Sequence, residues 1–366
     1  VLVMYKGNIV EQGTVTSIFK NPVHNYTKAL INSRPSLNTR LKTLPTIQDF
    51  LNDSISNEII TPKQREENHE KLYAKKPLLE VINVEKEYLS SAIFIALGHS
   101  ARDTLKMLHE KDVALEQRQI SVGVRIEHPA ETINLIRYGE KYKNFNGLGA
   151  ATYSLNYTNR KTKRGVYTFC MCPGGEIVNA SSVQGMLVLN GMSYSRRSSP
   201  FSNAALVVSC HADDFKSTNP LAGIEFQKDI EQKSFNKGGR NWEEPAQNLM
   251  NFLGESSSNN LHKNSYKMGI VPANMRDIFP DFVTDQLLAA FNKWKEEVPL
   301  FVSNHAILLG AETRTSSPIR ITRNEKFESV NIKNLYPIGE GSGYTGGITS
   351  SAADAIKAVE TQVLPE

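Results

Sequence analysis

Two short alternating runs of apolar residues open the chain. The stretch "VLVMYKGNIVEQ" alternates apolar and polar positions on both sides of a Lys-Gly-Asn turn, which predicts two short strands joined by that turn. Thr14 then precedes "VTSIFK", which predicts a short helix that is capped by Thr14 and ends before Pro22. A second short helix is expected over "NYTKALIN", and it should end before Pro35.

The pattern changes after this opening. Residues 36–76 are polar, and "TPKQREENHEKLYAKK" is charged with few apolar positions. Such a stretch has little apolar surface to bury, which predicts a linker, or at most a mobile helix. The next stretch, "KPLLEVINVEKEY", alternates like a strand within residues 77–91.

An α/β pattern begins at about residue 92. The stretch "AIFIALGHSARDTLKMLHEKDV" predicts a buried strand, a glycine turn and an amphipathic helix. Alternating strands, a Pro-Gly-Gly turn and several helices follow over residues 118–304. The last unit, "LYPIGEGSGYTGGITSSAADAIKAVE", reads as a short buried strand, a glycine-rich turn and a helix from about Ile348. The sequence therefore predicts an α/β fold.

Composition excludes several classes of protein. The 366 residues are 40% hydrophobic and 22% charged, which is typical of a folded globular chain. A net charge of +4 without a dense basic block is too mild to indicate nucleic acid as a partner. The longest apolar runs are too short to span a bilayer. Three cysteines do not form a disulfide framework, so we expect a reducing, cytoplasmic location.

The glycine-rich turn near the end of the chain is the best candidate for a ligand site. Ligands of open α/β sheets bind beyond the carboxyl ends of strands, and Gly339 and Glu340 stand at such a position. Further glycines follow at Gly341, Gly343, Gly346 and Gly347. The helix from Ile348 would point free N–H groups at the turn. The alternative is a tight strand-to-helix turn whose glycines serve packing alone.

The stretch "FCMCPGG" places Cys170 and Cys172 on one face of a strand just before a turn. This separation is near the upper limit for a disulfide, and two thiols without a second pair make a poor zinc site, so no metal site is predicted. The two cysteines are either small buried apolar residues beside a hairpin or candidate catalytic residues on a turn that faces a substrate or a cofactor.

The loop "ETRTSSP" contains a carboxylate, a guanidinium and several hydroxyls. Arg314 could bind a substrate carboxylate through two hydrogen bonds, which makes it a third candidate catalytic residue. The alternative is a capped surface loop with a solvated arginine.

From about residue 92 to the end, the chain resembles the C-terminal part of a family of uncharacterised FAD-dependent dehydrogenases, which are flavoproteins with two dinucleotide-binding lobes. The resemblance lies in "ALGHSARDT", "VGVRIEHP", "RGVYTFCMCPGGEIVNASS", "GIVPANMRDIFPDFV" and the glycine-rich turn. It implies an FAD-dependent oxidoreductase acting on a small molecule. Residues 92–117 and 305–366 would belong to the FAD-binding domain, and 118–304 to an inserted α+β domain on the substrate side. Glu340 would bind the ribityl chain, and Gly346, Gly347 and Ile348 would face the flavin ring.

A two-lobed FAD site also needs an earlier strand followed by G-x-G-x-x-G, which holds the pyrophosphate. This pattern does not occur between residues 1 and 92. We therefore expect an incomplete dinucleotide fold that holds FAD weakly or not at all. The strands at residues 93–97 and 335–338 should then expose apolar edges.

A different resemblance occupies residues 1–90. The stretches "VMYKGNIVEQG", "IFKNP" and "HNYTKALINSRP" resemble the C-terminal end of the ATP-binding subunit of oligopeptide importers, over residues 1–35. Residues 77–91 resemble the first strand of a second such cassette, but no G-x-x-x-x-G-K-[ST] follows. Two alternatives to the flavoprotein hypothesis therefore remain: a fragment of an importer subunit with a relic contact to its membrane subunits, or a fusion remnant without function.

Overall fold

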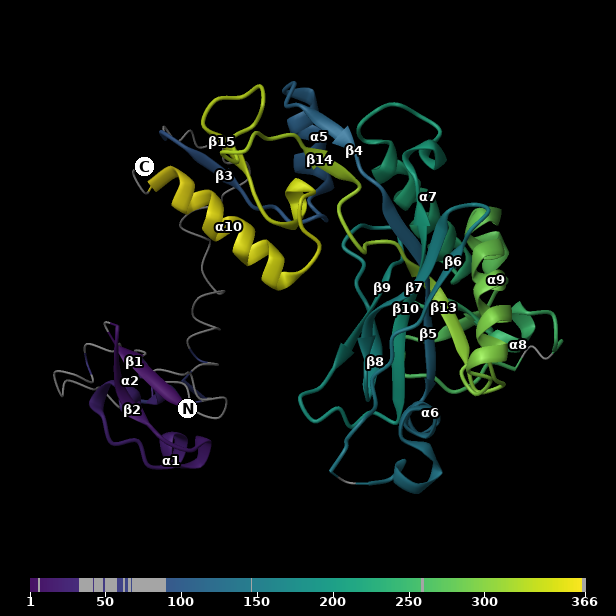
Figure 1. Ribbon diagram of the computed structural model, residues 1–366, viewed down its shortest axis with the longest axis horizontal. Coiled ribbons are helices and arrows are strands. Elements are labelled where there is room, and N and C mark those ends of the chain that lie inside the picture. Colours follow the sequence, from purple (N-terminus) through teal and green to yellow (C-terminus); the bar gives the residue numbers. More distant parts are fainter. Residues whose placement is uncertain are drawn as a thin grey trace. The chain divides into compact units, whose positions relative to one another are not determined.

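The computed structural model describes residues 1–5, 7–32, 90–145, 147–257 and 260–363, with a few separate positions between 42 and 67 (Figure 1). It divides into two compact units, Val1–Tyr88 and Leu89–Glu366. The predicted linker at 36–76 and the predicted strand within 77–91 lie almost entirely outside the described residues.

The first unit has the elements predicted from its apolar pattern. Strands β1 (Leu2–Tyr5) and β2 (Asn8–Gln12) pair antiparallel, and the helices α1 (Val15–Lys20) and α2 (Asn25–Asn32) follow. Thr14 caps α1 as predicted, because its hydroxyl oxygen accepts the Ser17 N–H at 3.1 Å. Val3, Ile18 and Ala29 form the buried centre of this unit.

A mixed seven-stranded sheet dominates the second unit. Its strands, in spatial order, are β12 (Ile270–Pro272), β11 (Glu244–Asn248), β13 (Ile307–Glu312), β5 (Ile120–Pro129), β10 (Phe201–Cys210), β7 (Arg164–Cys172) and β6 (Asn156–Asn159). Within this sheet of the described residues, β11 and β12 pair in parallel and all other neighbouring strands pair antiparallel. The central strands β5 and β10 are almost wholly buried, because both faces of the sheet are covered.

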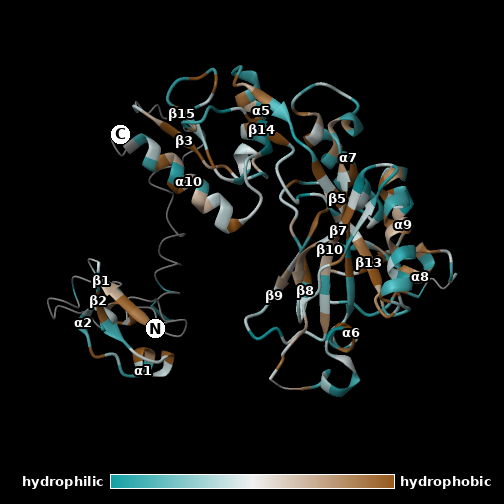
Figure 2. Cartoon of the chain, viewed as in Figure 1, coloured by the Kyte–Doolittle hydropathy of each residue, from teal (hydrophilic) through white to brown (hydrophobic). Residues whose placement is uncertain are grey.

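Helices and a hairpin cover the two faces. The helices are α6 (Ala130–Tyr142), α7 (Ala222–Lys237), α8 (Leu249–Phe252) and α9 (Asp281–Glu297), with short 3₁₀ turns η1 (Ala212–Phe215) and η2 (Met275–Asp277). Leu308 faces the core that α9 completes with Phe291 and Trp294. Its neighbours Ile307 and Leu309 face the antiparallel hairpin of β8 (Gly175–Asn179) and β9 (Leu189–Ser193). Figure 2 shows brown, hydrophobic segments along strands of this sheet.

The predicted strand–turn–helix units form a smaller group of elements. Strand β3 (Ile93–Ile95) pairs in parallel with β15 (Leu335–Pro337), and β4 (Leu115–Gln117) pairs antiparallel with β14 (Ile319–Ile321). The helices are α5 (Arg102–Glu110) and α10 (Ile348–Val363), with the 3₁₀ turn η3 (Glu340–Ser342) after β15. Helix α10 begins at Ile348 as predicted.

Strand β3 differs from its prediction as a buried strand. Ile93 is 56% exposed and Phe94 37%, because β3 pairs only with β15 among the described residues. The expected exposed edge is thus present at β3. It is absent at β15, where Leu335, Tyr336 and Ile338 are buried.

The second unit confirms the α/β fold class in its coarse form. Strand β13 lies in the range 305–366 that we predict for the FAD-binding domain, yet it pairs with β5 and β11 of the large sheet. The sheet therefore takes strands from both sides of the predicted boundary at residue 304.

Candidate functional site around the glycine-rich loop

The parallel pairing of β3 and β15 brings two loops together at the carboxyl ends of these strands. Gly341 lies against the backbone of Gly98, so closely that a Cβ atom on Gly341 would collide with it. The Nδ1 atom of His99 lies 3.5 Å from Oε2 of Glu340, and both side chains are about one quarter exposed. The strand ends therefore present a carboxylate and an imidazole side by side, at the position where open α/β sheets bind ligands.

An ion pair fastens the loop to α10. Arg323 binds Asp354 at 2.6 Å, and the same carboxylate accepts the Gly339 N–H at 2.8 Å. Burial opposes ionisation of Asp354, but the bonds from Arg323 and Gly339 outweigh it and lower the pKa of this carboxyl. Gly339 (φ 70°) and Gly343 (φ 83°) supply the left-handed backbone that the loop requires. Side chains of the chain itself thus hold the loop in shape.

The start of α10 is open. Within the part of the chain that the structure describes, no atom lies within 4 Å of a Cβ placed on Gly346, and Ile348 is 92% exposed. Gly347 would meet only the Ser350 hydroxyl. The first N–H groups of a 16-residue helix are therefore accessible to an electron-rich group of a flat ligand.

Arg118, which the sequence analysis did not single out, lies close to this loop. Burial and the charge of Arg320 lower the pKa of its guanidinium, whereas the charge of Glu340 raises it. Among the described residues its buried Nη1 has no hydrogen-bond partner. Arg118 follows a three-residue strand without any motif, so the sequence offered no signal for it. An unpaired donor beside Glu340 is suited to a ligand that carries acceptor atoms.

The cysteine turn lies at the end of β7 as predicted. A bulge between Phe169 and Cys172 interrupts the alternation on which the same-face prediction rests, and Cys170 has a φ of 42°. Cys170 is exposed and Cys172 half-buried. Burial is the main cause that raises the pKa of both thiols, and Glu340 is one of the negative charges that add to the rise at Cys170. The thiol turn is therefore within the range at which the charge of Glu340 acts on Cys170.

Arg125 holds the cysteine turn from inside. Its fully buried guanidinium donates to the Cys170 carbonyl at 2.7 Å, lies 3.6 Å from the Cys172 sulfur and pairs with Glu312 at 2.8 Å. A side chain on Gly191 would occupy the space of this guanidinium. Arg125 is not predictable from the sequence, because nothing in a buried strand pattern marks one arginine as the centre of a polar cluster.

Arg314 lies in a second buried cluster. Its Nε and Nη2 atoms bind the two oxygens of Glu231 at 3.2 and 3.1 Å, and Arg102 binds the same carboxylate at 2.7 and 2.9 Å. Burial opposes ionisation of Glu231, but the hydrogen bonds from both arginines outweigh it and lower its pKa. The remaining Nη1 of Arg314 reaches the hydroxyls of Ser182 at 2.7 Å and Ser100 at 3.4 Å. The two-bond geometry predicted for a substrate carboxylate is thus occupied by Glu231.

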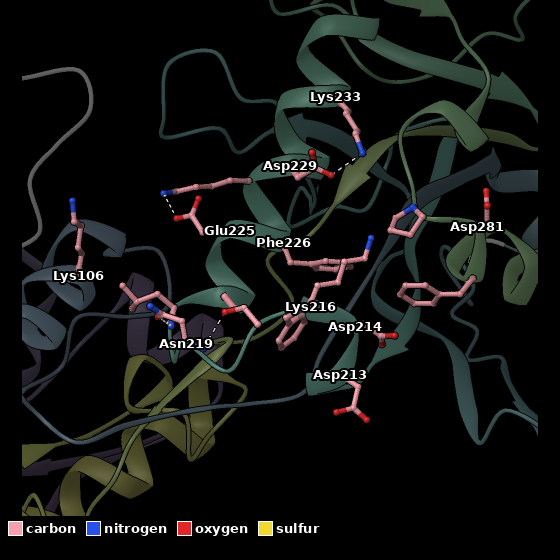
Figure 3. A pocket seen from close by; sticks show the side chains of 17 residues that line it. Lys106, Asp213, Asp214, Lys216, Asn219, Glu225, Phe226, Asp229, Lys233 and Asp281 are labelled. Carbon is pink, nitrogen blue, oxygen red and sulfur yellow. Dashed lines mark hydrogen bonds and ion pairs between the residues drawn. The ribbon is translucent and has the colours of Figure 1, made fainter.

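A large cavity lies elsewhere on the second unit (Figure 3). It measures about 980 Å³ and lies along α7, η1 and the start of α9. Phe215, Phe226 and Phe282 contribute its apolar lining, and lysines and carboxylates surround them. None of the candidate residues at the glycine-rich loop, the cysteine turn or Arg314 lines this cavity. Among the described residues, no group of three or more metal-binding side chains occurs, and no helix is long and apolar enough to cross a membrane.

Comparison with known proteins identifies the family. Residues 119–315, more than half of the chain, match the family described as FAD-dependent protein, C-terminal domain-like. The chain belongs to this family. A member from Clostridium beijerinckii, an uncharacterized protein, is 43% identical over 294 residues. The alignment covers 80% of the present chain and 55% of that relative, so the chain spans about half of its length.

The first unit has separate relatives. Residues 10–56 match the C-terminal region of oligopeptide/dipeptide transporters. The oligopeptide transport ATP-binding protein OppD of Mycoplasma genitalium is 48% identical over 63 residues, which cover 17% of this chain and 15% of that protein. The dipeptide transport ATP-binding protein DppF of Haemophilus influenzae is 50% identical over 42 residues, or 12% of this chain and 13% of that protein. Both resemblances inferred from the sequence are confirmed.

Proposed function

We propose that the second unit is the flavin-facing part of an FAD-dependent oxidoreductase that acts on a small molecule. The observation that supports this most is the meeting of Glu340, His99 and the Gly341–Gly98 backbone contact at two parallel strand ends. Membership of an FAD-dependent family supports FAD as the ligand. When bound, the flavin supplies an acceptor for two electrons, which the chain's own residues lack.

The residues divide into two groups in this proposal. Glu340 accepts hydrogen bonds from the ribityl hydroxyls, and the unpaired donor of Arg118 binds an acceptor atom of the cofactor. Gly346, Gly347 and Ile348 form the open surface for the ring. Gly339, Gly341 and Gly343 shape the turn.

The cysteine turn supplies the substrate side of the proposed site. Because the pKa of both thiols is raised, Cys170 and Cys172 are neutral near pH 7 and suit proton donation better than nucleophilic attack. Arg314 acts as a positioning residue in this scheme, since Glu231 occupies the Nε–Nη2 edge of its guanidinium.

Affinity for FAD should be low. The sequence contains no G-x-G-x-x-G before β3, and that loop normally holds the pyrophosphate. Each charge-assisted hydrogen bond that is not formed costs roughly 1.5–3 kcal/mol, so several of them lower the affinity by powers of ten. We therefore propose FAD binding in the micromolar to millimolar range.

The test is a titration of FAD monitored by flavin fluorescence and by the visible spectrum. We expect saturable binding that weakens at least tenfold in Glu340→Ala and is unchanged in Glu360→Ala, which removes an exposed carboxylate of α10. Equal binding by wild type and Glu340→Ala would contradict the role of the loop. A stoichiometric flavin band that survives gel filtration, and is lost in Glu340→Ala, would instead show that this half of the site suffices for tight binding.

We further propose that the first unit corresponds to the C-terminal region of a peptide-importer ATP-binding subunit and does not hydrolyse ATP by itself. Its relatives are named as transport ATP-binding proteins, but the chain contains no G-x-x-x-x-G-K-[ST] loop to hold the nucleotide phosphates. Phosphate release from ATP by the purified chain should not exceed background. ATP-dependent phosphate release that follows the protein through purification would refute this.

A further inference from the structure

The two-stranded ribbon of β4 and β14 (Figure 1) carries two arginines on one face. Arg320 of β14 stands opposite Glu116 of β4. The N–H of Arg118 donates to the Pro318 carbonyl at 2.9 Å, which extends the pairing by one residue. Arg118 and Arg320 are therefore diagonal neighbours on the ribbon, at the spacing of roughly 7 Å that such neighbours have.

The glycine-rich loop borders these two arginines. A Cβ atom on Gly343 would collide with the backbone of Ile319 and Arg320, so the loop lies directly on β14. The guanidinium of Arg320 lies over the Tyr344 ring, 5.0 Å from its centroid. The charge of Glu340 acts on Arg118 and raises its pKa. The arginine pair thus lies beside the candidate ligand site.

Neither arginine has a full set of partners. Within the described residues, the Arg118 side chain makes no hydrogen bond and no ion pair, and its Nη1 is buried. Arg320 binds Glu116 at 3.0 Å through Nη1, but its buried Nε has no partner in the same part of the chain. Burial and the charge of Arg320 lower the pKa of the Arg118 guanidinium. Two like charges with unpaired N–H groups are unfavourable, and an anion between them relieves both costs.

We propose that Arg118 and Arg320 form a binding site for a phosphoryl group. Such a group has three oxygens and up to two negative charges, so it can accept hydrogen bonds from both guanidiniums at once. A carboxylate has only two oxygens, which one arginine satisfies, and Arg320 already has the carboxylate of Glu116. Arg118 is partly exposed and the Arg320 side chain is 39% exposed, so a small ion can approach both from solvent.

Two kinds of molecule carry such a group at a flavin site. One is the flavin nucleotide itself, and the other is a phosphorylated substrate. The choice between these sources rests on the proposed function, whereas the assignment of the anion rests on the two arginines. Inorganic phosphate therefore tests the anion site without a flavin, and riboflavin tests the flavin-facing loop without a phosphate.

The first experiment is a calorimetric titration of the whole chain with inorganic phosphate at constant ionic strength. We expect a Kd on the order of 1 mM, in keeping with a few charge-assisted hydrogen bonds. Arg118→Gln and Arg320→Gln should each weaken binding by roughly tenfold, and Arg118→Lys should weaken it less, because it keeps the charge and loses the fork. Arg160→Gln is the matched control, because it removes an exposed arginine outside the site, and it should bind phosphate like wild type.

Three results would overturn the proposal. The first is equal phosphate affinity in wild type, Arg118→Gln and Arg320→Gln, with circular dichroism showing that the variants are folded. The second is a wild type that binds no phosphate, because another group then occupies the arginines. The third is acetate that binds as tightly as phosphate, because the site would then not select a phosphoryl group.

Flavin titrations identify the source of the phosphoryl group. If it belongs to the cofactor, FMN and FAD should bind more tightly than riboflavin, and Arg118→Gln should remove this difference. If it belongs to a separate substrate, phosphate should still bind to the chain saturated with riboflavin or FMN. Phosphate binding that requires Arg118 in a chain that binds no flavin would contradict the proposed function and support the anion site, so the two failures are distinguishable.

Discussion

Two neighbouring residues on β5 should control how stability changes with pH. Glu127 and His128 point to opposite faces of the sheet, and both are fully buried. The carboxylate of Glu127 accepts the Ser265 N–H at 2.7 Å, yet burial raises its pKa to about 7. Nε2 of His128 lies 2.8 Å from the Phe301 carbonyl oxygen, and burial lowers its pKa to about 4.

These shifts have opposite consequences. Glu127 loses its proton near pH 4.5 in the unfolded chain but near 7 in the native one, so the free energy of unfolding falls as pH rises between these values. At 1.36 kcal/mol per pKa unit the loss is about 3 kcal/mol. His128 takes up its proton near pH 6.5 when unfolded and near 4 when native, so about 3 kcal/mol is lost as pH falls through this range. The two effects largely cancel between pH 4.5 and 6.5.

Single substitutions should reveal the two opposing effects. Glu127→Gln keeps an oxygen for the Ser265 N–H and removes the charge, so we expect it to match wild type at pH 4.5 and to be more stable by about 3 kcal/mol at pH 8. His128→Gln should show the reverse, with its gain over wild type at pH 4. Urea unfolding monitored by tryptophan fluorescence is the assay, because Trp242 and Trp294 both lie in the second unit. If the difference between Glu127→Gln and wild type is the same at pH 4.5 and 8, the reasoning is wrong.

Two further substitutions test the clusters and the capping. Glu231→Gln should destabilise the second unit by roughly 3–5 kcal/mol, because it leaves the buried guanidiniums of Arg102 and Arg314 without a charged partner. Urea unfolding measures this loss of stability. A loss below about 1 kcal/mol would contradict the prediction. Thr14→Ala should cost the first unit about 1 kcal/mol, since the N–H of Ser17 loses its acceptor. Circular dichroism during thermal unfolding measures this, with Thr14→Ser as the control that keeps the hydroxyl.

The sequence by itself determined the elements whose causes are local. The cap at Thr14 joins two residues three positions apart, and the turn after β15 depends on its own glycines and on the helix that begins at Ile348. Capping residues, glycines and apolar periodicity were sufficient to predict the cap, the turn and the helix. Each of these elements is stabilised by contacts within a few positions of the chain. The two family resemblances were also readable, since they rest on continuous motifs.

Only the tertiary structure decided which side chains meet. Arg125 pairs with Glu312 across 187 positions, and Arg314 pairs with Glu231 across 83. The bulge at Cys170 arises where β7 pairs with β10, and Ile93 is exposed because, among the described residues, no second strand pairs with β3 besides β15. Such features depend on strand order and on the packing of distant elements, and a periodic pattern contains neither. The sequence therefore predicted the glycine-rich turn and the helix that follows it, while the buried ion pairs of Arg125 and Arg314 are visible only in the folded chain.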